Sequence, residues 1–335
     1  MIVIDGSAGE GGGQILRTSV ALGALTSKPV TVRNIRAGRN PPGLKPQHVA
    51  AIEAVAQVCG AEVKGNYPGY GEIVFEPGPV NAGVFSFDVG TAGSATLVIQ
   101  SLLPVLAGAG GDFCFTVQGG TDVSWSPQAD YLKNVTLPLV ERFGPRIRMK
   151  IARRGYYPKG GGLVEVRVSG SELKPVSLLE PGGVLAVKGV SHAHISLKER
   201  QVCERQANSA RKNMVYYDKV GITCDYADTL SVGSGITLWA ECKNTILGAD
   251  FLGARDLRAE EVGRKAALGL LGELQSGACL DKHMADQIVP YLAIAGGKAT
   301  VSEATEHCKT NIWVCNQFGF DVRLEGKTII AGGDS

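Results

Sequence analysis

The sequence predicts an α/β (α+β) protein built from three copies of one helix–sheet unit, each with two helices packed on a small sheet. Three observations predict this architecture. A common order of turn, helix, strand and helix recurs along the chain without sequence identity. Each copy offers an apolar helical stripe and an alternating strand, which cannot bury themselves singly. The 335 residues suffice for about two domains of ~150 residues each, so we expect a large repeat domain and a smaller inserted one.

The first copy begins with an apolar N-terminal stretch that predicts a buried strand, followed by a Gly-rich turn over residues 9–13. This turn opens a helix over 14–25, whose apolar spacing gives it one buried face. The remaining elements of this copy are a strand over 29–35, a loop over 36–46, a helix over 47–59 and a strand near 62–63 that closes the unit. Further strands over 73–75, 85–89 and 163–168 are predicted between the copies.

The second and third copies repeat this order. The second is predicted to have a turn over 90–93, a helix over 94–106, a strand over 113–117, a loop over 119–127 and a helix over 129–143. The third is predicted to have a helix over 284–294, a strand over 299–302, a helix over 310–318 and strands over 321–324 and 328–331.

About a hundred residues of different character separate the second copy from the third. They predict strands over 184–190, 223–227 and 236–242 and helices over 198–216 and 259–274. A compact module inserted between the repeats is the simplest explanation. We therefore expect a discontinuous domain, residues 1–180 plus 277–335, and an inserted α/β domain, residues 181–276.

The formal net charge of +2 argues against a polybasic protein, but the charges are unevenly distributed. Residues 11–52 and 142–159 contain no acidic side chain and many basic ones. Such runs are commonly solvated faces, and two of them in a nearly neutral protein also fit a polyanionic partner.

The eight cysteines have no C-x-x-C spacing and lie mostly in apolar stretches, which predicts reduced thiols and no zinc site. The N-terminus lacks the features of a signal peptide, and no apolar run reaches the ~18 residues needed to cross a bilayer. We expect a cytoplasmic protein without a membrane partner.

The Gly-rich turn over residues 5–13 follows a strand and opens a helix, as phosphate-binding loops do. It is neither a Walker A loop nor a dinucleotide fingerprint, and a simple tight turn is the competing interpretation. Glu10 favours a functional role, because a carboxylate in such a loop can hold a divalent metal. Arg17 can reach the same end of the helix.

His307 is the histidine of most interest, because it lies at a loop-to-helix junction where the turns of the other copies should converge. Taken alone, a histidine there would commonly serve capping or packing. His48 lies within a helix face and is expected to be structural. His192 and His194 form an H-x-H pair without a third ligand nearby, which is weak support for a metal site.

Six ordered stretches carry a more specific signal: DGSAGEGGGQILRTSVAL, IRAGRNPPGLKPQH, GSATLVIQSLLP, VQGGTD, HMADQ and HCKTN. Together they closely resemble the RNA 3′-terminal phosphate cyclase family. The resemblance covers nearly the whole chain, although the inserted module matches more by position and length than by motif.

The resemblance implies a three-step reaction that consumes ATP. A histidine attacks the α-phosphate of ATP, releases pyrophosphate and becomes a histidine–AMP phosphoramidate. AMP then passes to the 3′-phosphate of an RNA, giving an RNA(3′)pp(5′)A intermediate. Finally the neighbouring 2′-hydroxyl attacks the activated phosphate and expels AMP, leaving a 2′,3′-cyclic phosphodiester.

The resemblance also assigns roles to individual residues. His307 is the nucleophile, and Glu10 is the carboxylate linked to Mg²⁺ or Mn²⁺. The phosphate or RNA end is held by Arg17, Arg39 and Gln47. The residues that match ATP-binding positions are Gln100, His283, Met284, Ala285, Asp286 and Gln287. His283 departs from the tyrosine frequent in bacterial members, which could alter how adenine stacks. The expected partner is RNA with a 3′-phosphate end, and the resemblance allows a homodimer.

Three alternatives remain at this point. A non-catalytic cyclase-like protein of ribosome assembly would lack the catalytic histidine, which is present here as His307. An enolpyruvyl transferase uses similar repeats, but the insert and the His307 motif fit it poorly. A plain RNA-binding module would explain the basic runs but not the HMADQ and HCKTN segments.

Overall fold

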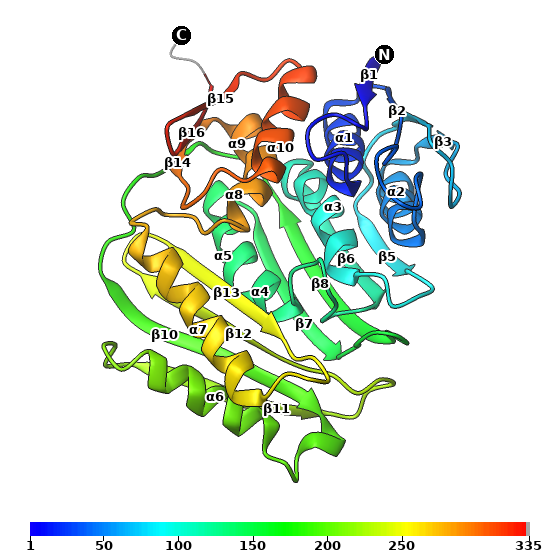
Figure 1. Ribbon diagram of the computed structural model, residues 1–335. Coiled ribbons are helices and arrows are strands. Elements are labelled where there is room, and N and C mark those ends of the chain that lie inside the picture. Colours follow the sequence, from blue (N-terminus) through cyan, green and yellow to red (C-terminus); the bar gives the residue numbers. More distant parts are fainter. Residues whose placement is uncertain (333–335) are drawn as a thin grey trace.

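A computed structural model describes residues 1–332, in which four four-stranded sheets are arranged around a set of central helices (Figure 1). Three of the sheets share one topology. In each of them the first strand pairs in parallel with the second, the second pairs antiparallel with the fourth, and the fourth pairs antiparallel with the third. The prediction of a mixed α/β protein built from repeated helix–sheet units is confirmed.

The first unit occupies the N-terminal part of the chain. Its elements are β1 (Ile2–Asp5), α1 (Gly13–Thr26), β2 (Val30–Arg33), α2 (Pro46–Cys59), β3 (Glu62–Lys64) and β4 (Ile73–Glu76). The N-terminal strand differs from the prediction, because β1 lies at the edge of its sheet and Ile4 is its only fully buried residue. An edge strand of this kind needs only one apolar side chain to hold it on the core.

The second unit has the longest strands. Its elements are β5 (Gly83–Asp88), α3 (Ala95–Gly108), β6 (Gly111–Gly119), a helical segment over residues 129–143, β7 (Arg146–Arg153) and β8 (Gly162–Gly170). The helical segment comprises α4 (Ala129–Tyr131), a π-turn (Leu132–Thr136), α5 (Leu137–Val140) and a 3₁₀ turn (Glu141–Phe143). Strand β7 was not predicted, because its sequence RIRMKIAR is dominated by charge, yet its apolar residues alternate and Ile147 and Met149 are buried.

The third unit is interrupted. Its elements are β9 (Val176–Leu178), α8 (Met284–Gln287), α9 (Val289–Ala295), β14 (Gly297–Thr300), α10 (Glu306–Gln317), β15 (Val322–Glu325) and β16 (Thr328–Ala331). Because β9 pairs in parallel with β14, the inserted segment lies inside the third unit and not between the second and third. The three-residue β9 is too short to give a periodic signal in the sequence.

The two ends of the inserted segment meet at Thr300. The Thr300 hydroxyl donates to the carbonyl of Leu179 at 3.2 Å and accepts from the amide of Cys279 at 3.0 Å. The chain therefore leaves the third unit and re-enters it at one position of the sheet.

The inserted segment forms its own sheet, with the order β11-β10-β12-β13. Its elements are β10 (Val184–His194), a 3₁₀ turn (Ile195–Leu197), α6 (Val202–Asn213), β11 (Val220–Ala227), β12 (Ser234–Cys242), β13 (Ile246–Leu252) and α7 (Ala259–Gln275). Helices α6 and α7 pack on this sheet and on each other (Figure 1), while β12 and β13 also contact the helical segment of the second unit. The boundaries 1–180 plus 277–335 and 181–276 stay a prediction.

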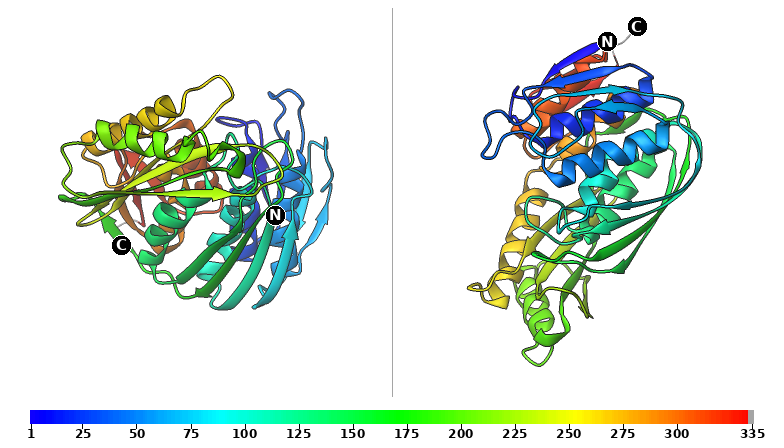
Figure 2. Two further views of the ribbon diagram at one scale, coloured as in Figure 1. Left: turned by 90° about the horizontal axis from the view of Figure 1, so that it is seen from below. Right: turned by 90° about the vertical axis from the view of Figure 1, so that its right-hand side faces the viewer.

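The main core lies between the helices and the inner faces of the three repeat sheets. Helix α1 packs against α2, α3 and α10, so all three units meet at one helix. Figure 2 shows strands of the second unit as an outer layer over the helices. On β6 the inward residues Phe113, Phe115 and Val117 are buried and alternate with half-buried ones, as expected for a sheet with one wet face.

All eight cysteines are free, and six of them are buried, as the sequence predicts. Within residues 1–332, none of the helices is both long enough and apolar enough to pass through a membrane.

The Gly-rich turn before α1 contacts the first turns of α10. Gly9 has a φ of +55°, and a Cβ atom there would lie 2.4 Å from Thr310 Oγ1. Only glycine combines this backbone conformation with so close an approach. The next residue continues the contact, because the Glu10 amide donates to the same hydroxyl at 3.3 Å.

We expect Gly9→Ala to lower the free energy of unfolding by more than about 1 kcal/mol, because it adds both a strained φ and a clash with Thr310. Urea denaturation monitored by circular dichroism measures the effect. Gly38→Ala is the matched control, since that Cβ would meet nothing within 4 Å and its backbone is not left-handed. Equal stability of the two variants would contradict this explanation of the turn.

Candidate active site

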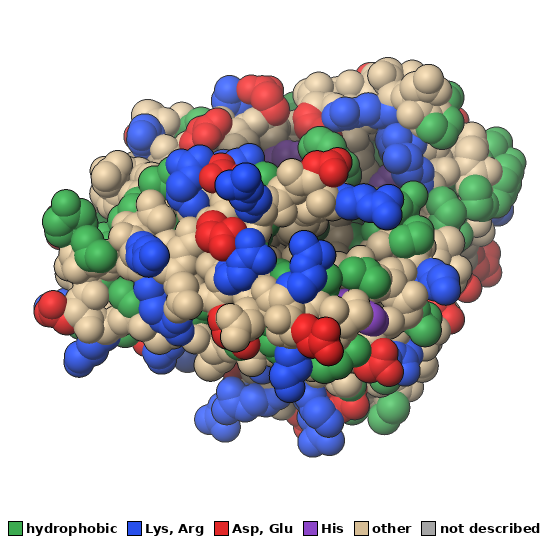
Figure 3. All heavy atoms as spheres, turned by 60° about the horizontal axis from the view of Figure 1, so that its bottom comes forward, with side chains coloured by type: hydrophobic (Ala, Val, Ile, Leu, Met, Phe, Trp, Pro, Cys, Tyr) green, Lys and Arg blue, Asp and Glu red, His purple; other side chains and the backbone are tan. Residues whose placement is uncertain are grey.

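A cleft of about 1300 Å³ lies where the three repeat units and one loop of the inserted segment meet. Figure 3 shows Lys and Arg side chains around a hollow on this face of the molecule. The basic residues that line the cleft are Arg17, Arg36, Arg39, Lys45 and Arg255. Four of them come from the first acid-free run, so this run contributes directly to a concave, positively charged surface that suits an anionic ligand.

Most residues selected from the sequence line this one cleft although they are far apart in the chain. They are Glu10, Arg17, Arg39, Gln47, Gln100, His283, Asp286, Gln287 and His307. Met284 and Ala285 do not join them, because both are fully buried in the core. Their position at the start of α8 turns these two side chains inward and leaves those of Asp286 and Gln287 at the cleft.

His307 lies in the first turn of α10, which begins at Glu306 and not at residue 310 as predicted. The helix is capped by Thr305, whose side chain accepts from the amide of Cys308 at 3.2 Å. The cap explains the earlier start, because it satisfies an amide that would otherwise be unpaired. The His307 side chain is 51% exposed, so one of its ring nitrogens is accessible from the cleft.

Glu10 connects the first and third units across the cleft. Its Oε2 lies 3.3 Å from His307 Nδ1, and its Oε1 accepts from the Arg39 guanidinium at 2.9 Å. The same Arg39 nitrogen donates to the Glu10 carbonyl at 2.8 Å. Oε2 is buried and has no hydrogen-bond partner within residues 1–332. A buried carboxylate oxygen with a free lone pair fits one ligand of a hard divalent cation that takes its other ligands from phosphate.

Asp286 lies in the same cleft as Glu10 and His307. Its carboxylate accepts from Gln14 Nε2 at 2.6 Å, and its carbonyl accepts from Asn311 Nδ2 at 2.8 Å. Burial raises the pKa of Asp286 to about 6, although the bond from Gln14 and the nearby His307 and Arg17 oppose the shift. A carboxyl group with this pKa can change its protonation near neutral pH, which is a common property of functional sites.

Arg17 and Gln100 present unpaired polar groups to the cleft. Burial lowers the pKa of Arg17 to about 10, which still leaves the guanidinium charged at neutral pH. Within residues 1–332, the half-buried Arg17 has no side-chain partner among the described ion pairs, and the buried Gln100 Nε2 has no acceptor. Both also line a cavity of about 50 Å³ next to the cleft. Unpaired buried donors of this kind are costly unless a ligand supplies acceptors.

Two more residues on this side of the cleft are fixed in place. Gln287 accepts from the Thr136 hydroxyl at 2.8 Å and donates to the carbonyl of His283 at 2.9 Å. The His283 ring stands edge-on to Tyr131, with 6.3 Å between centroids. Burial lowers the pKa of His283, which favours a neutral aromatic surface.

His48 is structural, as expected. Its Nδ1 accepts from the Lys45 amide at 3.1 Å and so caps α2. Burial, with Arg17 and Arg36 nearby, lowers the pKa of this histidine to about 3. A neutral ring is therefore the stable form at all physiological pH values.

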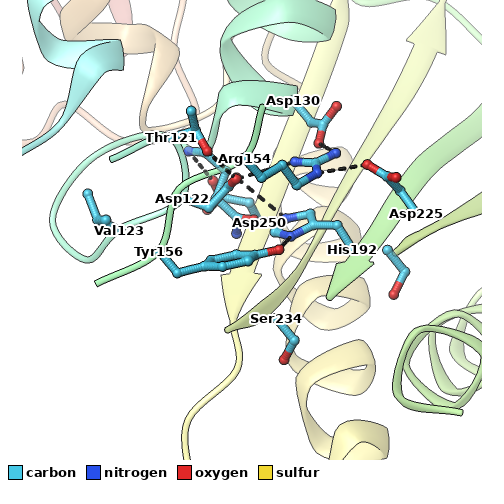
Figure 4. Close-up of polar contacts among 12 residues, drawn as sticks. Thr121, Asp122, Val123, Asp130, Arg154, Tyr156, His192, Asp225, Ser234 and Asp250 are labelled. Carbon is cyan, nitrogen blue, oxygen red and sulfur yellow. Dashed lines mark hydrogen bonds and ion pairs between the residues drawn. The ribbon is translucent and has the colours of Figure 1, made fainter. Parts of the chain in front are cut away.

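A buried polar cluster lies beside the cleft, where the second unit contacts the inserted sheet (Figure 4). Arg154 is at its centre and pairs with Asp122 at 3.3 Å, Asp130 at 2.7 Å and Asp225 at 2.8 Å. Asp122, Asp130 and His192 are close enough together to resemble metal ligands. The guanidinium places one positive charge among three carboxylates, and this partial neutralisation makes their close approach possible without showing an ion there.

Sequence reasoning gave no role to several residues that shape this region. Gln14 and Asn311 occur within the quoted motifs, but only the fold shows that both bind Asp286. Arg154 belongs to the second basic run, where nothing in the local sequence separates a buried arginine from exposed ones. Asp250 lines the cleft from β13, a strand the sequence did not predict.

Comparison with known proteins identifies the class. The family model for RNA 3′-terminal phosphate cyclase matches residues 8–325. Curated proteins named RNA 3′-terminal phosphate cyclase are similar over nearly their full length. That of Thermococcus onnurineus is 50% identical over 98% of this chain and 96% of its own, and that of Pyrococcus furiosus is 48% identical over 95% and 93%. This chain therefore belongs to the RNA 3′-terminal phosphate cyclase family.

One further relative has the same name, whereas the match to a solved structure is weak. The protein of the same name from Methanothermobacter thermautotrophicus is 46% identical over 98% of this chain and 97% of its own. Among solved structures, EPSP synthase from Acinetobacter baumannii matches with a TM-score of 0.30 and 14% identity, over 95% of this chain and 61% of that one. That likeness is too weak to support any conclusion.

Asp250 gives a pH-dependent test of the cleft. Burial raises the pKa of this carboxyl to about 6, so the native state holds its proton more tightly than the unfolded chain does. The native state therefore loses stability as pH rises from about 4 through 6, where Asp250 ionises. We expect Asp250→Asn, which cannot ionise, to stabilise the protein by about 1–3 kcal/mol more at pH 8 than at pH 5.

Thermal unfolding of both proteins at the two pH values measures this difference. Asp256→Asn changes an exposed aspartate of the same cleft and is the matched control, with no comparable gain expected. A gain for Asp250→Asn that is equal at both pH values would contradict the assigned ionisation.

Proposed function

We propose that this protein uses ATP to convert the 3′-terminal phosphate of an RNA into a 2′,3′-cyclic phosphodiester, with His307 as the nucleophile. The observation that carries the proposal is the approach of His307 to Glu10, at 3.3 Å, in a cleft lined by arginines. Family membership supports the same reaction. His307 also argues against the non-catalytic alternative, because that branch would lack this residue.

In the first step, Nε2 of His307 attacks the α-phosphorus of ATP. An N–P bond forms, the bond between the α-phosphorus and its bridging oxygen breaks, and pyrophosphate leaves. Glu10 beside Nδ1 favours the tautomer with the proton on Nδ1, which leaves the lone pair of Nε2 free. The contact is longer than a good hydrogen bond, and such contacts commonly tighten when a substrate binds.

In the second step, an oxygen of the RNA 3′-phosphate attacks the same phosphorus. The N–P bond breaks, His307 is released, and an RNA(3′)pp(5′)A intermediate forms. In the third step, the neighbouring 2′-oxygen attacks the 3′-phosphorus, loses its proton and expels AMP. The product is the cyclic phosphodiester, and the protein returns to its starting state.

The cationic and amide side chains of the cleft have distinct proposed roles. Arg17, Arg39 and Gln47 hold phosphate oxygens, for which a guanidinium fork is well suited. Gln100, Asp286 and Gln287 bind the adenylate, and His283 offers a ring for the base. The buried Nε2 of Gln100 supports this division, because it lacks an acceptor that a nucleotide provides.

A divalent metal is part of the proposal. Glu10 would hold Mg²⁺ or Mn²⁺, and the ion would neutralise phosphate charge while the bonds to phosphorus change. The buried Oε2 supports this assignment, because a carboxylate oxygen has two lone pairs and can face His307 Nδ1 with one while the other is open to an ion. A cytoplasmic location, supported by the unpaired cysteines, and a homodimer, supported by resemblance alone, are also proposals.

His307→Ala is expected to abolish covalent labelling by ATP carrying a labelled α-phosphate. In the wild type the label should be acid-labile and alkali-stable, as a phosphoramidate is. Gel autoradiography after incubation with ATP and Mg²⁺ or Mn²⁺ measures it. The control is His194→Ala, because His194 lies outside the cleft and bonds Ser196. Label that persists without His307 would remove this residue from the nucleophilic role.

Arg39→Ala is expected to reduce cyclisation of 3′-phosphate RNA by about tenfold or more, and self-adenylation by less, because the guanidinium has free N–H groups for the terminal phosphate. Single-turnover assays of each step separate the effects. Arg33→Ala, which removes a surface pair with Glu72, serves as the control. Equal losses in both steps would assign Arg39 to ATP instead.

A further inference from the structure

Trp125 is the most exposed large apolar side chain in the described part of the protein. It lies at the tip of the loop over residues 120–128, called here the Trp125 loop, and is 98% exposed. The loop follows β6 and lines the cleft that contains His307. A tryptophan so exposed contributes nothing to the core, so its position calls for another explanation.

The backbone at Trp125 is also unusual. Its φ is +66°, a conformation that is unfavourable for a bulky side chain and that glycine or asparagine would adopt more easily. Folding gains no packing in return, since the ring touches almost no protein surface. An unfavourable conformation kept at the rim of a cleft indicates a functional role for the side chain.

The Trp125 loop is held firmly at its base. Asp122, near the start of the loop, and Asp130, just after its end, both pair with the buried Arg154 (Figure 4). The Ala129 amide donates to the carbonyl of Thr121 at 3.0 Å, which closes the base of the loop. Near the tip, the Ser126 hydroxyl donates to the carbonyl of Val123 at 2.9 Å.

The same loop is tied to the inserted sheet. The Gln128 amide donates to Asp250 of β13 at 3.0 Å, and Gln128 Oε1 accepts from Nε2 of the buried His192 on β10 at 2.7 Å. Arg154 extends the connection to Asp225 of β11. These contacts fix the backbone of the loop that carries Trp125. Because the loop is already ordered, less conformational entropy is lost when a ligand contacts the ring.

The surroundings of Trp125 suit a single-stranded polyanion. Arg39 and Lys45 of the first unit and Arg255 of the inserted segment line the same cleft. An aromatic ring beside cationic side chains is the combination with which proteins bind unpaired nucleotides, because bases stack on the ring and phosphates meet the cations.

We propose that Trp125 is a stacking platform for a nucleobase at the 3′ end of the RNA, and that it holds this end while the terminal phosphate meets His307. This proposal rests on the proposed function. Because every base has a π-face, stacking tolerates all four bases and confers little sequence preference.

The test compares Trp125→Ala and Trp125→Phe with the wild type on an RNA ending in 3′-phosphate. We expect Trp125→Ala to raise the KM for RNA by about tenfold, whereas self-adenylation without RNA stays unchanged. Trp125→Phe keeps a ring and should recover most of the affinity. Tyr216→Ala removes another exposed aromatic side chain, 90% exposed and outside the cleft, and should behave as wild type.

Two further measurements add evidence of another kind, the first from binding without turnover and the second from a change of substrate. Titration of the wild type with 3′-phosphate RNA, without ATP, should quench tryptophan fluorescence, and Trp125→Phe should lose this quenching. RNAs that lack the terminal or the penultimate base identify the stacked nucleotide, because the KM penalty of Trp125→Ala should vanish with one of them.

The proposal is overturned if the wild type cyclises RNA while Trp125→Ala keeps the wild-type KM, or if the penalty persists with both abasic RNAs. An equal loss of self-adenylation would also overturn it, because Trp125 would then serve ATP. In these cases the proposed cyclase function stands. If the wild type neither adenylates itself nor cyclises RNA, the function itself fails, and the role of Trp125 fails with it.

Discussion

The close approach of the Gly-rich turn to helix α10 is the contact on which the site depends. At Gly9 the backbone comes so near Thr310 that no side chain fits between them. This contact sets the distance between the first and third units. Glu10 and His307 lie close to it in the chain, so it also brings their side chains within 3.3 Å of each other. Backbone packing thus brings together a carboxylate and a histidine from opposite ends of the chain, the two groups to which we assign the central roles in the proposed reaction.

The two basic runs have different structural fates, which their composition could not distinguish. The first folds around the cleft and contributes Arg17, Arg36, Arg39 and Lys45 to its wall. Most of the second becomes strand β7, whose Arg148 and Lys150 lie on the wet face of a sheet and come only within 4.0 Å of Glu141 and Glu165, while Arg154 just beyond the strand is buried. Such exposed pairs add little stability. Local concentration of charge at a concave surface, and not the net charge of the chain, indicates the ligand.

Sequence reasoning succeeded where a signal was local and failed where it was not. The amphipathic helices and the residues of the quoted motifs were predictable, because apolar periodicity and the order of motifs are properties of the sequence itself. Strand β9 was missed because three residues carry no period. Met284 and Ala285 were included because the family resemblance covers the whole HMADQ segment, and a motif match does not show which of its side chains face the core. The contacts of Arg154 join segments that are distant in the chain, and the exposure of Trp125 depends on how its loop is held, so no window of sequence contains either property.

The meeting of both ends of the inserted segment at Thr300 has a consequence for how the protein folds. Strand β9 must wait for β14, which is synthesised more than a hundred residues later, so their pairing has a high contact order. Once the inserted sheet has formed, its adjacent ends bring β9 and β14 together as if a short loop joined them, and the entropy of closing the third unit falls accordingly. Folding of the inserted segment therefore lowers the entropy cost of pairing β9 with β14 and so favours formation of the unit that carries His307.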